Sequence, residues 1–237
     1  MGIALAFMIV MNILAVGLPF NGKSTAEISD SFKVLFVPAG YVFSIWGVIY
    51  ITQIWAFYKL CKNQEKYKAL IEKIAMWFVV ANWANGLWLV FWHYQEIYWT
   101  LPVMLLLLVS LIVMYLTIKK EFADVRHLTI PFGIYLGWIT VATVANFTDV
   151  FYSLKWDGFG LDGEYWSCIL ILVASILGFF MIKRQREYSY SAVIVWAIVG
   201  IGIKFNSNSN ILLAVIIGIA IQLFAAFYVL DKRKKIK

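Results

Sequence analysis

The chain contains eight stretches of roughly 20 predominantly apolar residues, and this pattern restricts its fold more than any other feature. The stretches run approximately over residues 2–20, 38–58, 70–93, 97–118, 130–152, 165–183, 188–205 and 211–230. The hydrocarbon core of a bilayer is about 30 Å thick, and a helix of roughly 20 residues crosses it with its backbone polar groups paired internally. The sequence therefore predicts an all-α integral membrane protein, a polytopic bundle of about eight transmembrane helices.

The composition argues against a soluble or nucleic-acid-binding protein. Of the 237 residues, 63% are hydrophobic and only 14% are charged, whereas soluble domains carry roughly 25% charged residues. The net charge of +7 comes from Lys and Arg in short islands between apolar stretches, and not from the clustered basic face that nucleic acids require. We expect the lipid bilayer to be the main partner, and we expect no nucleic acid.

The basic residues alternate between the connections of the predicted helices. Of the 20 Lys and Arg residues, most fall around residues 59–73, 119–126 and 183–186 and in the tail after residue 230. The exceptions are Lys23, Lys33, Lys155 and Lys204. Because cytoplasmic loops carry the excess of Lys and Arg, we place both termini in the cytoplasm, with a bacterial plasma membrane as the expected location.

The same alternation places the loops at 21–37, 94–96, 153–164 and 206–210 outside. The longest of them, 21–37, is expected to fold back over the helix ends as a lid. Trp99, Trp156 and Trp166 lie at predicted helix ends, where indole rings favour the membrane interface. They are expected to form part of an interfacial aromatic belt.

Cysteine and histidine give no indication of a disulfide or a metal site. The topology places Cys61 and Cys168 on opposite sides of the membrane, which excludes a bridge between them. His93 and His127 are the only histidines and have no metal-ligand spacing. The sequence therefore predicts no metal.

Three predicted helices each carry a face of aromatic and polar residues at spacings of three and four. These faces are Phe43, Trp46, Tyr50, Gln53 and Phe57; Ala81, Asn85, Trp88, Trp92 and Glu96; and Tyr135, Trp138, Ala142, Asn146 and Asp149. Polar groups inside a membrane are costly unless they face protein or a water-filled cavity. The faces are therefore expected to meet and to enclose a pocket that opens outward beneath the 21–37 loop.

Two points about these faces stay open. Asn85 and Asn146 could instead be interhelical hydrogen-bonding residues, with the aromatic rings merely packing. Asp149 stands near a helix end, where a carboxylate usually reaches the interface and is solvated. The faces alone do not identify a ligand.

At the same residues the sequence resembles the translocator protein family, also called the TspO/MBR family or tryptophan-rich sensory proteins. The segment PAGYVFSIWGVIY at 38–50 is similar to the start of the family's second helix, with its Trp-x3-Tyr element at Trp46 and Tyr50. Asn85-x2-Trp88 resembles the Asn-Leu-x-Trp element of helix three, and Trp138-x3-Ala142-Thr143-x2-Asn146 resembles an element of helix five. The resemblance covers about residues 1–152, and the three helices within 153–237 have no counterpart in the family's five-helix core.

The resemblance implies a five-helix bundle with an aromatic pocket for hydrophobic planar molecules, such as porphyrins or sterols, between helices two, three and five. The matched ligand-binding positions are Trp46, Tyr50, Asn85, Trp88, Trp138, Ala142 and Asn146. It implies a role in sensing or transport that requires no cofactor, with a tetrapyrrole as a candidate ligand.

Two other functions are weighed beside this one. A secondary transporter of a small solute would use Asp149, Glu96 and Asn85 as a proton or substrate path. A porphyrin-degrading enzyme would place Trp138 near the ring, but no nucleophile–base pair or paired carboxylates support catalysis. We therefore expect no enzyme activity and assign no catalytic residue.

The pair Gly133-x3-Gly137 is a separate signal in the fifth predicted helix. Such small-residue pairs either let a neighbouring helix approach closely or promote self-association. A homodimer is therefore one expected arrangement.

Overall fold

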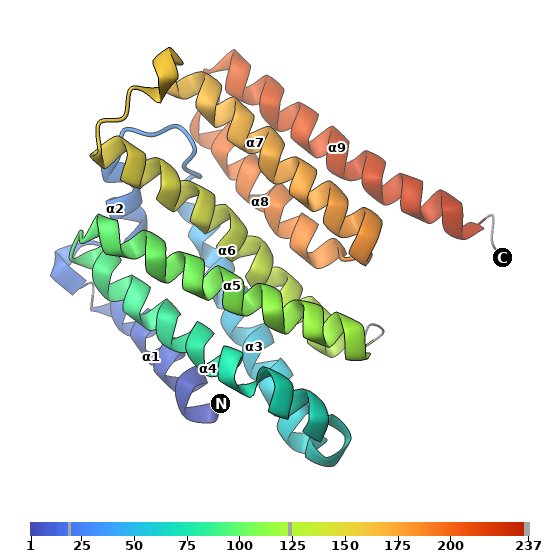
Figure 1. Ribbon diagram of the computed structural model, residues 1–237. Coiled ribbons are helices and arrows are strands. Elements are labelled where there is room, and N and C mark those ends of the chain that lie inside the picture. The colour runs from blue at the N-terminus through green and yellow to red at the C-terminus, as the bar shows by residue number, and fades with distance from the viewer. Residues whose placement is uncertain (19, 123–124, 235–237) are drawn as a thin grey trace.

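The computed structural model describes residues 1–18, 20–122 and 125–234. Every regular element within these ranges is helical, which confirms the all-α prediction (Figure 1). The helices are α1 (Gly2–Gly17), α2 (Thr25–Ser31), α3 (Ile45–Lys62), α4 (Gln64–His93), α5 (Ile97–Phe122), α6 (Arg126–Ser153), α7 (Gly163–Phe180), α8 (Tyr188–Lys204) and α9 (Ser209–Lys234). Residue 19, at the end of the first predicted helix, residues 123–124, in a basic connection, and residues 235–237, in the basic tail, lie outside the described residues.

Among the described residues, six helical segments are long and apolar enough to cross a membrane. They are Gly40–Lys62, Gln64–His93, Ile97–Phe122, Arg126–Ser153, Gly163–Gln185 and Ser209–Leu230. The remaining predicted segments are the shorter apolar helices α1, of 16 residues, and α8, of 17 residues. The chain is thus a polytopic helical membrane protein.

The boundaries of α3 and α4 differ from those predicted. The basic stretch around residues 59–73 is almost entirely helical, because Asn63 alone separates α3 from α4. Lys, Glu and Gln are good helix formers, so a helix continues through them once its apolar part has ended. At its other end α4 stops at His93. The prediction that Glu96 shares a face of this helix with Asn85 and Trp88 is therefore wrong.

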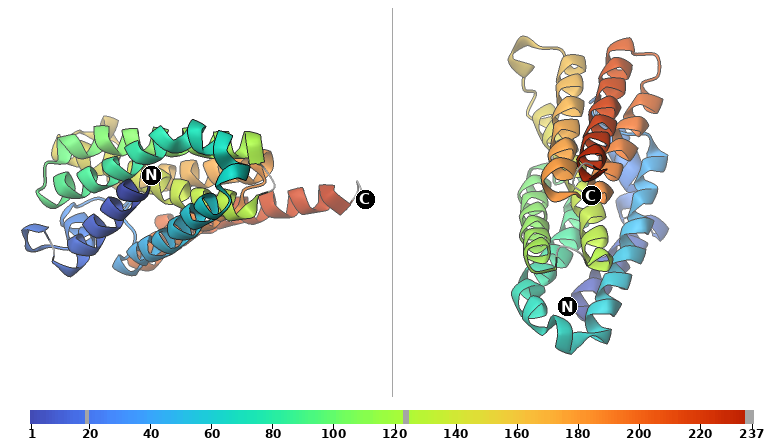
Figure 2. Two further views of the ribbon diagram at one scale, coloured as in Figure 1. Left: turned by 90° about the horizontal axis from the view of Figure 1, so that it is seen from below. Right: turned by 90° about the vertical axis from the view of Figure 1, so that its right-hand side faces the viewer.

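The helices form two groups that meet along α6 and α8. Helices α1 and α3–α6 pack together, and α7, α8 and α9 form the second group, which Figures 1 and 2 show on one side of the first. Gly133 and Gly137 of α6 lie at the contact between the groups: a Cβ atom added to Gly137 would lie 2.8 Å from the Tyr190 carbonyl oxygen. The glycine pair therefore lets a helix of the same chain approach closely. It gives no support to a homodimer, which remains a prediction.

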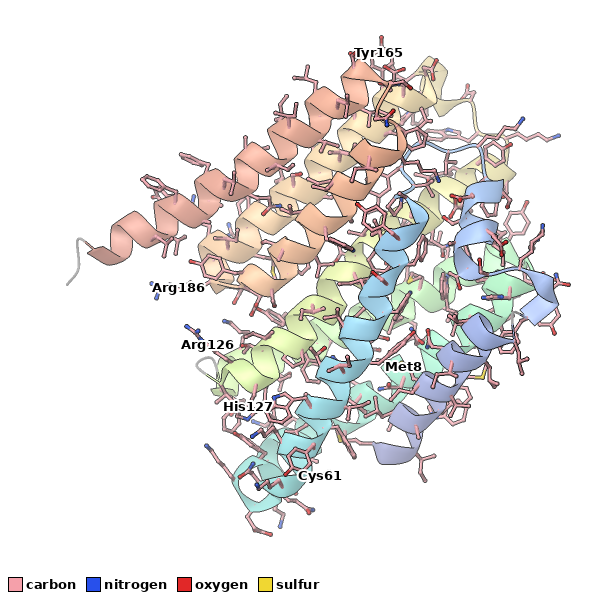
Figure 3. The ribbon with its side chains drawn as sticks, turned by 180° about the vertical axis from the view of Figure 1, so that it is seen from behind. Met8, Cys61, Arg126, His127, Tyr165 and Arg186 are labelled. Atoms are coloured by element: carbon pink, nitrogen blue, oxygen red, sulfur yellow. The ribbon has the colours of Figure 1, made fainter. Side chains whose placement is uncertain are left out.

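The basic connections gather at one end of the bundle. Figure 3 shows Cys61, Arg126 and Arg186 toward that end and Tyr165 at the opposite end. Cys61 and Cys168 are both free thiols. The arrangement has the charge asymmetry that the positive-inside rule associates with a cytoplasmic face.

Candidate ligand pocket

The three aromatic faces meet around a cavity of about 40 Å³. Helices α3, α4 and α6 supply most of its wall, and the segment between α1 and α3 supplies the rest. The lining residues are Ser29, Pro38, Phe43, Trp46, Trp88, Trp92, Trp138, Val141, Ala142, Ala145, Asn146 and Asp149. The structure thus brings together Trp46, Trp88, Trp138, Ala142 and Asn146 of the positions that the sequence predicted.

Edge-on and stacked ring contacts hold the aromatic walls in place. The Trp138 ring lies 5.7 Å from Phe43 and 6.2 Å from Trp46, at interplanar angles of 80° and 82°. On α4, Trp88 stacks on Trp92 at 5.3 Å and 21°. Such geometries are the preferred ones for aromatic pairs, and the rings of the cavity wall therefore support one another in the closed state.

Tyr50 and Asn85 lie outside the cavity lining. Tyr50 stacks on Trp46 at 5.9 Å and 21°, one turn farther along α3. The Asn85 carbonyl oxygen accepts a hydrogen bond of 2.7 Å from the Asn12 amide, which joins α4 to α1. Asn85 therefore makes an interhelical hydrogen bond, which is the alternative to a place in the cavity wall.

Asn146 combines both roles that were considered for it. Its amide nitrogen donates to Thr100 Oγ1 at 2.9 Å, joining α6 to α5. The same side chain lines the cavity. Because the amide group is fixed by Thr100, its carbonyl oxygen is held in a defined position.

Four buried polar atoms of cavity-lining residues have no hydrogen-bond partner among the described residues. They are Trp88 Nε1, Trp138 Nε1, Asn146 Oδ1 and Asp149 Oδ1. An unpaired buried donor or acceptor costs about 1–3 kcal/mol. An occupant that both donates and accepts hydrogen bonds would therefore complement this cavity.

Asp149 is 1% exposed, so the prediction that its carboxylate is solvated is wrong. Although it lies near the end of α6, the segment that precedes α3 covers this end. Phe32 of that segment packs edge-on against Tyr152, with ring centroids 6.3 Å apart. Helical spacing alone does not reveal such a cover.

The cover contains α2, a helix that was not predicted separately. Ser24 and Glu27 form a capping box at its start, in which each side chain accepts from the other residue's backbone N–H. Hydrogen bonds from the Ser24 backbone, and to a lesser extent from its side chain, hold the pKa of the Glu27 carboxyl below its ordinary value. The spacing Ser24-x2-Glu27 was the sequence signal that could have revealed α2.

Contacts from α4 hold one side of this cover. The Trp92 indole N–H donates to the Thr25 carbonyl at 3.2 Å. Thr25 Oγ1 lies 3.1 Å from His93 Nε2, within hydrogen-bonding distance. We call the segment 21–44 the lid. These contacts fix it to the end of α4, and its first part, residues 21–37, is the loop that was expected to fold over the helix ends.

Helix α8 holds the other side of the lid. The Ala39 N–H donates to the Gly200 carbonyl at 3.1 Å, and the Trp196 indole N–H donates to the Val42 carbonyl at 3.1 Å. Lys204 forms an ion pair with Asp30. Helix α8 thus helps to hold the lid over the cavity.

The closed cavity is small for the expected ligands. A water molecule needs about 10–15 Å³ measured in the same way, whereas pockets for small organic ligands usually reach about 300–1,000 Å³. At about 40 Å³ the cavity has room for a few water molecules. A planar ligand therefore requires the lid or the aromatic side chains to move.

The fold and the cavity together define a polytopic α-helical membrane protein with a small cavity, lined mainly by aromatic and apolar residues, among its helices. Over residues 1–228 the chain matches the family described as TSPO-like protein. It therefore belongs to the TSPO-like protein family, and the match includes the three C-terminal helices that the motif resemblance did not reach. Neither a search of curated proteins nor a search of solved structures found a match.

Proposed function

We propose that this TSPO-like protein binds a hydrophobic planar ligand, of the tetrapyrrole or sterol-like class, for sensing or transport. One observation carries the proposal: Trp46, Trp88, Trp138, Ala142 and Asn146 line a single cavity, and some of its lining residues carry unpaired buried polar atoms. Flat aromatic walls favour planar ligands because apolar burial grows with contact area, while a few polar groups orient the ligand.

Tyr50 and Asn85 belong to this proposal as supporting residues. Tyr50 backs the Trp46 ring, and Asn85 fixes α4 to α1 through Asn12. Their substitution is expected to affect the positions of the walls. No cofactor is required in this proposal.

Titration of protoporphyrin IX and haem into the detergent-purified protein tests the proposal through quenching of tryptophan fluorescence. Ala142→Phe adds a ring to a cavity of about 40 Å³, so we expect it to weaken binding about tenfold, equivalent to about 1.4 kcal/mol. Trp138→Phe is also expected to weaken ligand binding. The control is Trp83→Phe, because Trp83 is 49% exposed and stacks on Phe7 away from the cavity.

Saturable binding that is equal in the wild type and in Ala142→Phe would exclude this cavity as the site. The same titration under illumination addresses the enzyme alternative. Porphyrin absorbance that decays with the wild type, and persists with Trp138→Phe, would favour light-dependent breakdown.

The position of Asp149 favours one second candidate function, a secondary transporter of a small solute. Its buried carboxyl lines the cavity inside a membrane-spanning helix. Buried acidic residues of this kind often mark proton or substrate pathways. Proton-coupled uptake into proteoliposomes that Asp149→Asn abolishes would place this function first.

We also propose that α1 and α8 cross the membrane, with both termini in the cytoplasm of a bacterial cell. Helices of 16 and 17 residues span about 24–26 Å, close to the bilayer core. Eight crossings place the basic connections on one side, as the positive-inside rule requires. The division of the chain near residue 152 into a five-helix core and three additional helices remains part of this proposal.

Cysteine labelling tests the orientation. Cys61 is exposed and lies toward the basic end of the bundle (Figure 3). In a Cys168→Ser background, a membrane-impermeant maleimide is expected to label Cys61 only after the cells are permeabilised. Tyr165→Cys, made in a chain that lacks both native cysteines, is expected to be labelled in intact cells because Tyr165 lies at the opposite end. The reverse labelling pattern would invert the proposed topology.

A further inference from the structure

A second cavity, of about 700 Å³, shares no lining residue with the aromatic pocket. Its walls are the last turns of α6, the first turns of α7, residues 33–36 of the lid and the loop at 156–163. Because α7 lies beyond residue 152, the five-helix resemblance does not account for this cavity. Its volume falls within the range of about 300–1,000 Å³ that is usual for ligand sites.

The lining of this cavity is amphipathic. Val144 and Phe147 of α6 and Leu170 of α7 line it farther from the helix ends, within the membrane-spanning segments. Lys33, Asp157 and Asp162 line it at the loops. A molecule that matches it has an apolar chain along the helices and a charged group at the membrane surface.

Four aromatic rings, those of Phe151, Trp156, Phe159 and Trp166, cluster at the loop end of the cavity, which is called its mouth below. The Trp156 ring lies 4.9 Å from Phe151, 5.0 Å from Phe159 and 5.2 Å from Trp166. The Trp166 indole N–H donates to the Gly158 carbonyl at 2.9 Å, which fixes the loop against α7. These rings present faces on which a cation can bind.

The backbone of Phe159, which carries one of these rings, is strained. Its φ is 55°, a left-handed conformation that costs a non-glycine residue roughly 1–2 kcal/mol. The side chain is 81% exposed, so little packing compensates this cost. Strain of this kind persists mainly where it serves a function.

The charged groups at the mouth are available to a ligand. Asp157 and Asp162 each accept a backbone N–H, from Phe159 and Glu164 respectively. In the part of the chain that the structure describes, neither carboxylate forms an ion pair, and Lys33 forms none either. Two carboxylates beside aromatic rings attract an ammonium group, while a lysine attracts a phosphate.

We propose that this cavity binds a phospholipid with an ammonium head group, taken from the leaflet that borders the 21–37 and 153–164 loops. The ammonium group lies by Trp156, Phe159 and the two carboxylates, and Lys33 contacts the phosphate. One acyl chain follows Val144, Phe147 and Leu170 between α6 and α7, and the other chain stays in the bilayer. A zwitterionic head group matches this site because its ammonium group pairs with the two carboxylates and its phosphate pairs with Lys33.

Photocrosslinking in nanodiscs tests this proposal. Nanodiscs of phosphatidylethanolamine and phosphatidylglycerol carry a trace of either lipid with a diazirine in one acyl chain, and adducts are mapped by peptide mass spectrometry. We expect the phosphatidylethanolamine probe to label residues 144–170 preferentially. Phe159→Gly is expected to reduce this labelling about fivefold, equivalent to about 1 kcal/mol, and Asp157→Asn combined with Asp162→Asn is expected to reduce it to the level of phosphatidylglycerol.

Lys155→Gly is the matched control. Lys155 has a φ of 54° in the same loop but does not line the cavity, so glycine relieves the same kind of strain without removing a contact. Labelling is expected to be unchanged in Lys155→Gly and in Ala142→Phe, which alters the other cavity. Because glycine suits both positions, misfolding would not explain a selective loss in Phe159→Gly.

Three outcomes would overturn the proposal. Equal labelling by the two lipids would remove the head-group selectivity, and labelling spread evenly over all lipid-facing helices would remove the site. Crosslinks between two copies of the chain through residues 144–170, in place of lipid adducts, would assign the cavity to a dimer interface. None of these outcomes bears on porphyrin binding in the aromatic pocket.

Discussion

Gly137→Leu is expected to destabilise the protein by about 3 kcal/mol, the upper part of the usual range for overpacking. Even a Cβ atom at this position would lie 2.8 Å from the Tyr190 carbonyl oxygen and 3.2 Å from its Cα. Both atoms belong to the backbone of α8, so a side-chain rotation cannot relieve the clash. Helix α8 must move away from α6, and its contacts with the lid are expected to weaken with it.

Thermal unfolding in detergent, followed by tryptophan fluorescence at one scan rate, measures this effect. Gly47→Ala is the control, because Gly47 lies within α3 with no atom near the added methyl group. There, alanine is expected to leave the midpoint unchanged or to add up to about 1 kcal/mol of stability. Equal midpoints for the two variants would contradict the close packing of α8 on α6.

Asp149→Leu is expected to have the opposite effect on stability, raising it by about 1–3 kcal/mol, while ligand binding or proton-coupled transport is lost. The wild-type protein buries a carboxyl group with an unpaired oxygen. Replacing such a group by an apolar side chain of similar size removes the cost of its desolvation. A gain in stability with a loss of function is the usual pattern for a group retained for its function.

Melting midpoints and ligand titrations of Asp149→Leu and Asp149→Asn test this prediction together. Asn146→Leu is a useful contrast, because it breaks the hydrogen bond to Thr100 and is expected to destabilise the protein. If both Asp149 variants melt below the wild type, the carboxyl group has a structural partner and the functional interpretation fails.

The sequence predicted the helices well because the membrane imposes a simple rule on length and polarity. Each predicted apolar segment contains a helix, although Leu18, Pro38, Ala39 and Phe205 at the predicted ends lie outside the helices. The error at α4 arose from equating the end of the apolar stretch with the end of the helix. Lys and Glu have nearly the helix propensity of Leu, so α4 extends beyond its apolar stretch.

The candidate pocket could be predicted only in part. Trp46, Trp88 and Trp138, which each lie on a polar helical face in the sequence, line one cavity in the structure, because a face that is too polar for lipid must point inward. Spacing does not identify the partner of a buried amide, so the contact between Asn85 and Asn12 was not foreseen. Nor does it show what covers a helix end, which is why the burial of Asp149 was missed.

The contacts between the lid and α8 also set an order of assembly during synthesis. The Val42–Trp196 contact joins residues 154 apart, and the Asp30–Lys204 pair joins residues 174 apart. At translation rates of about 5–20 residues per second, the first partner waits about 8–35 s for the second to be made. Until α8 has been made, the lid is held by its contacts with α4 and lacks those with α8, so the cover of the cavity is the last part to be fixed in place.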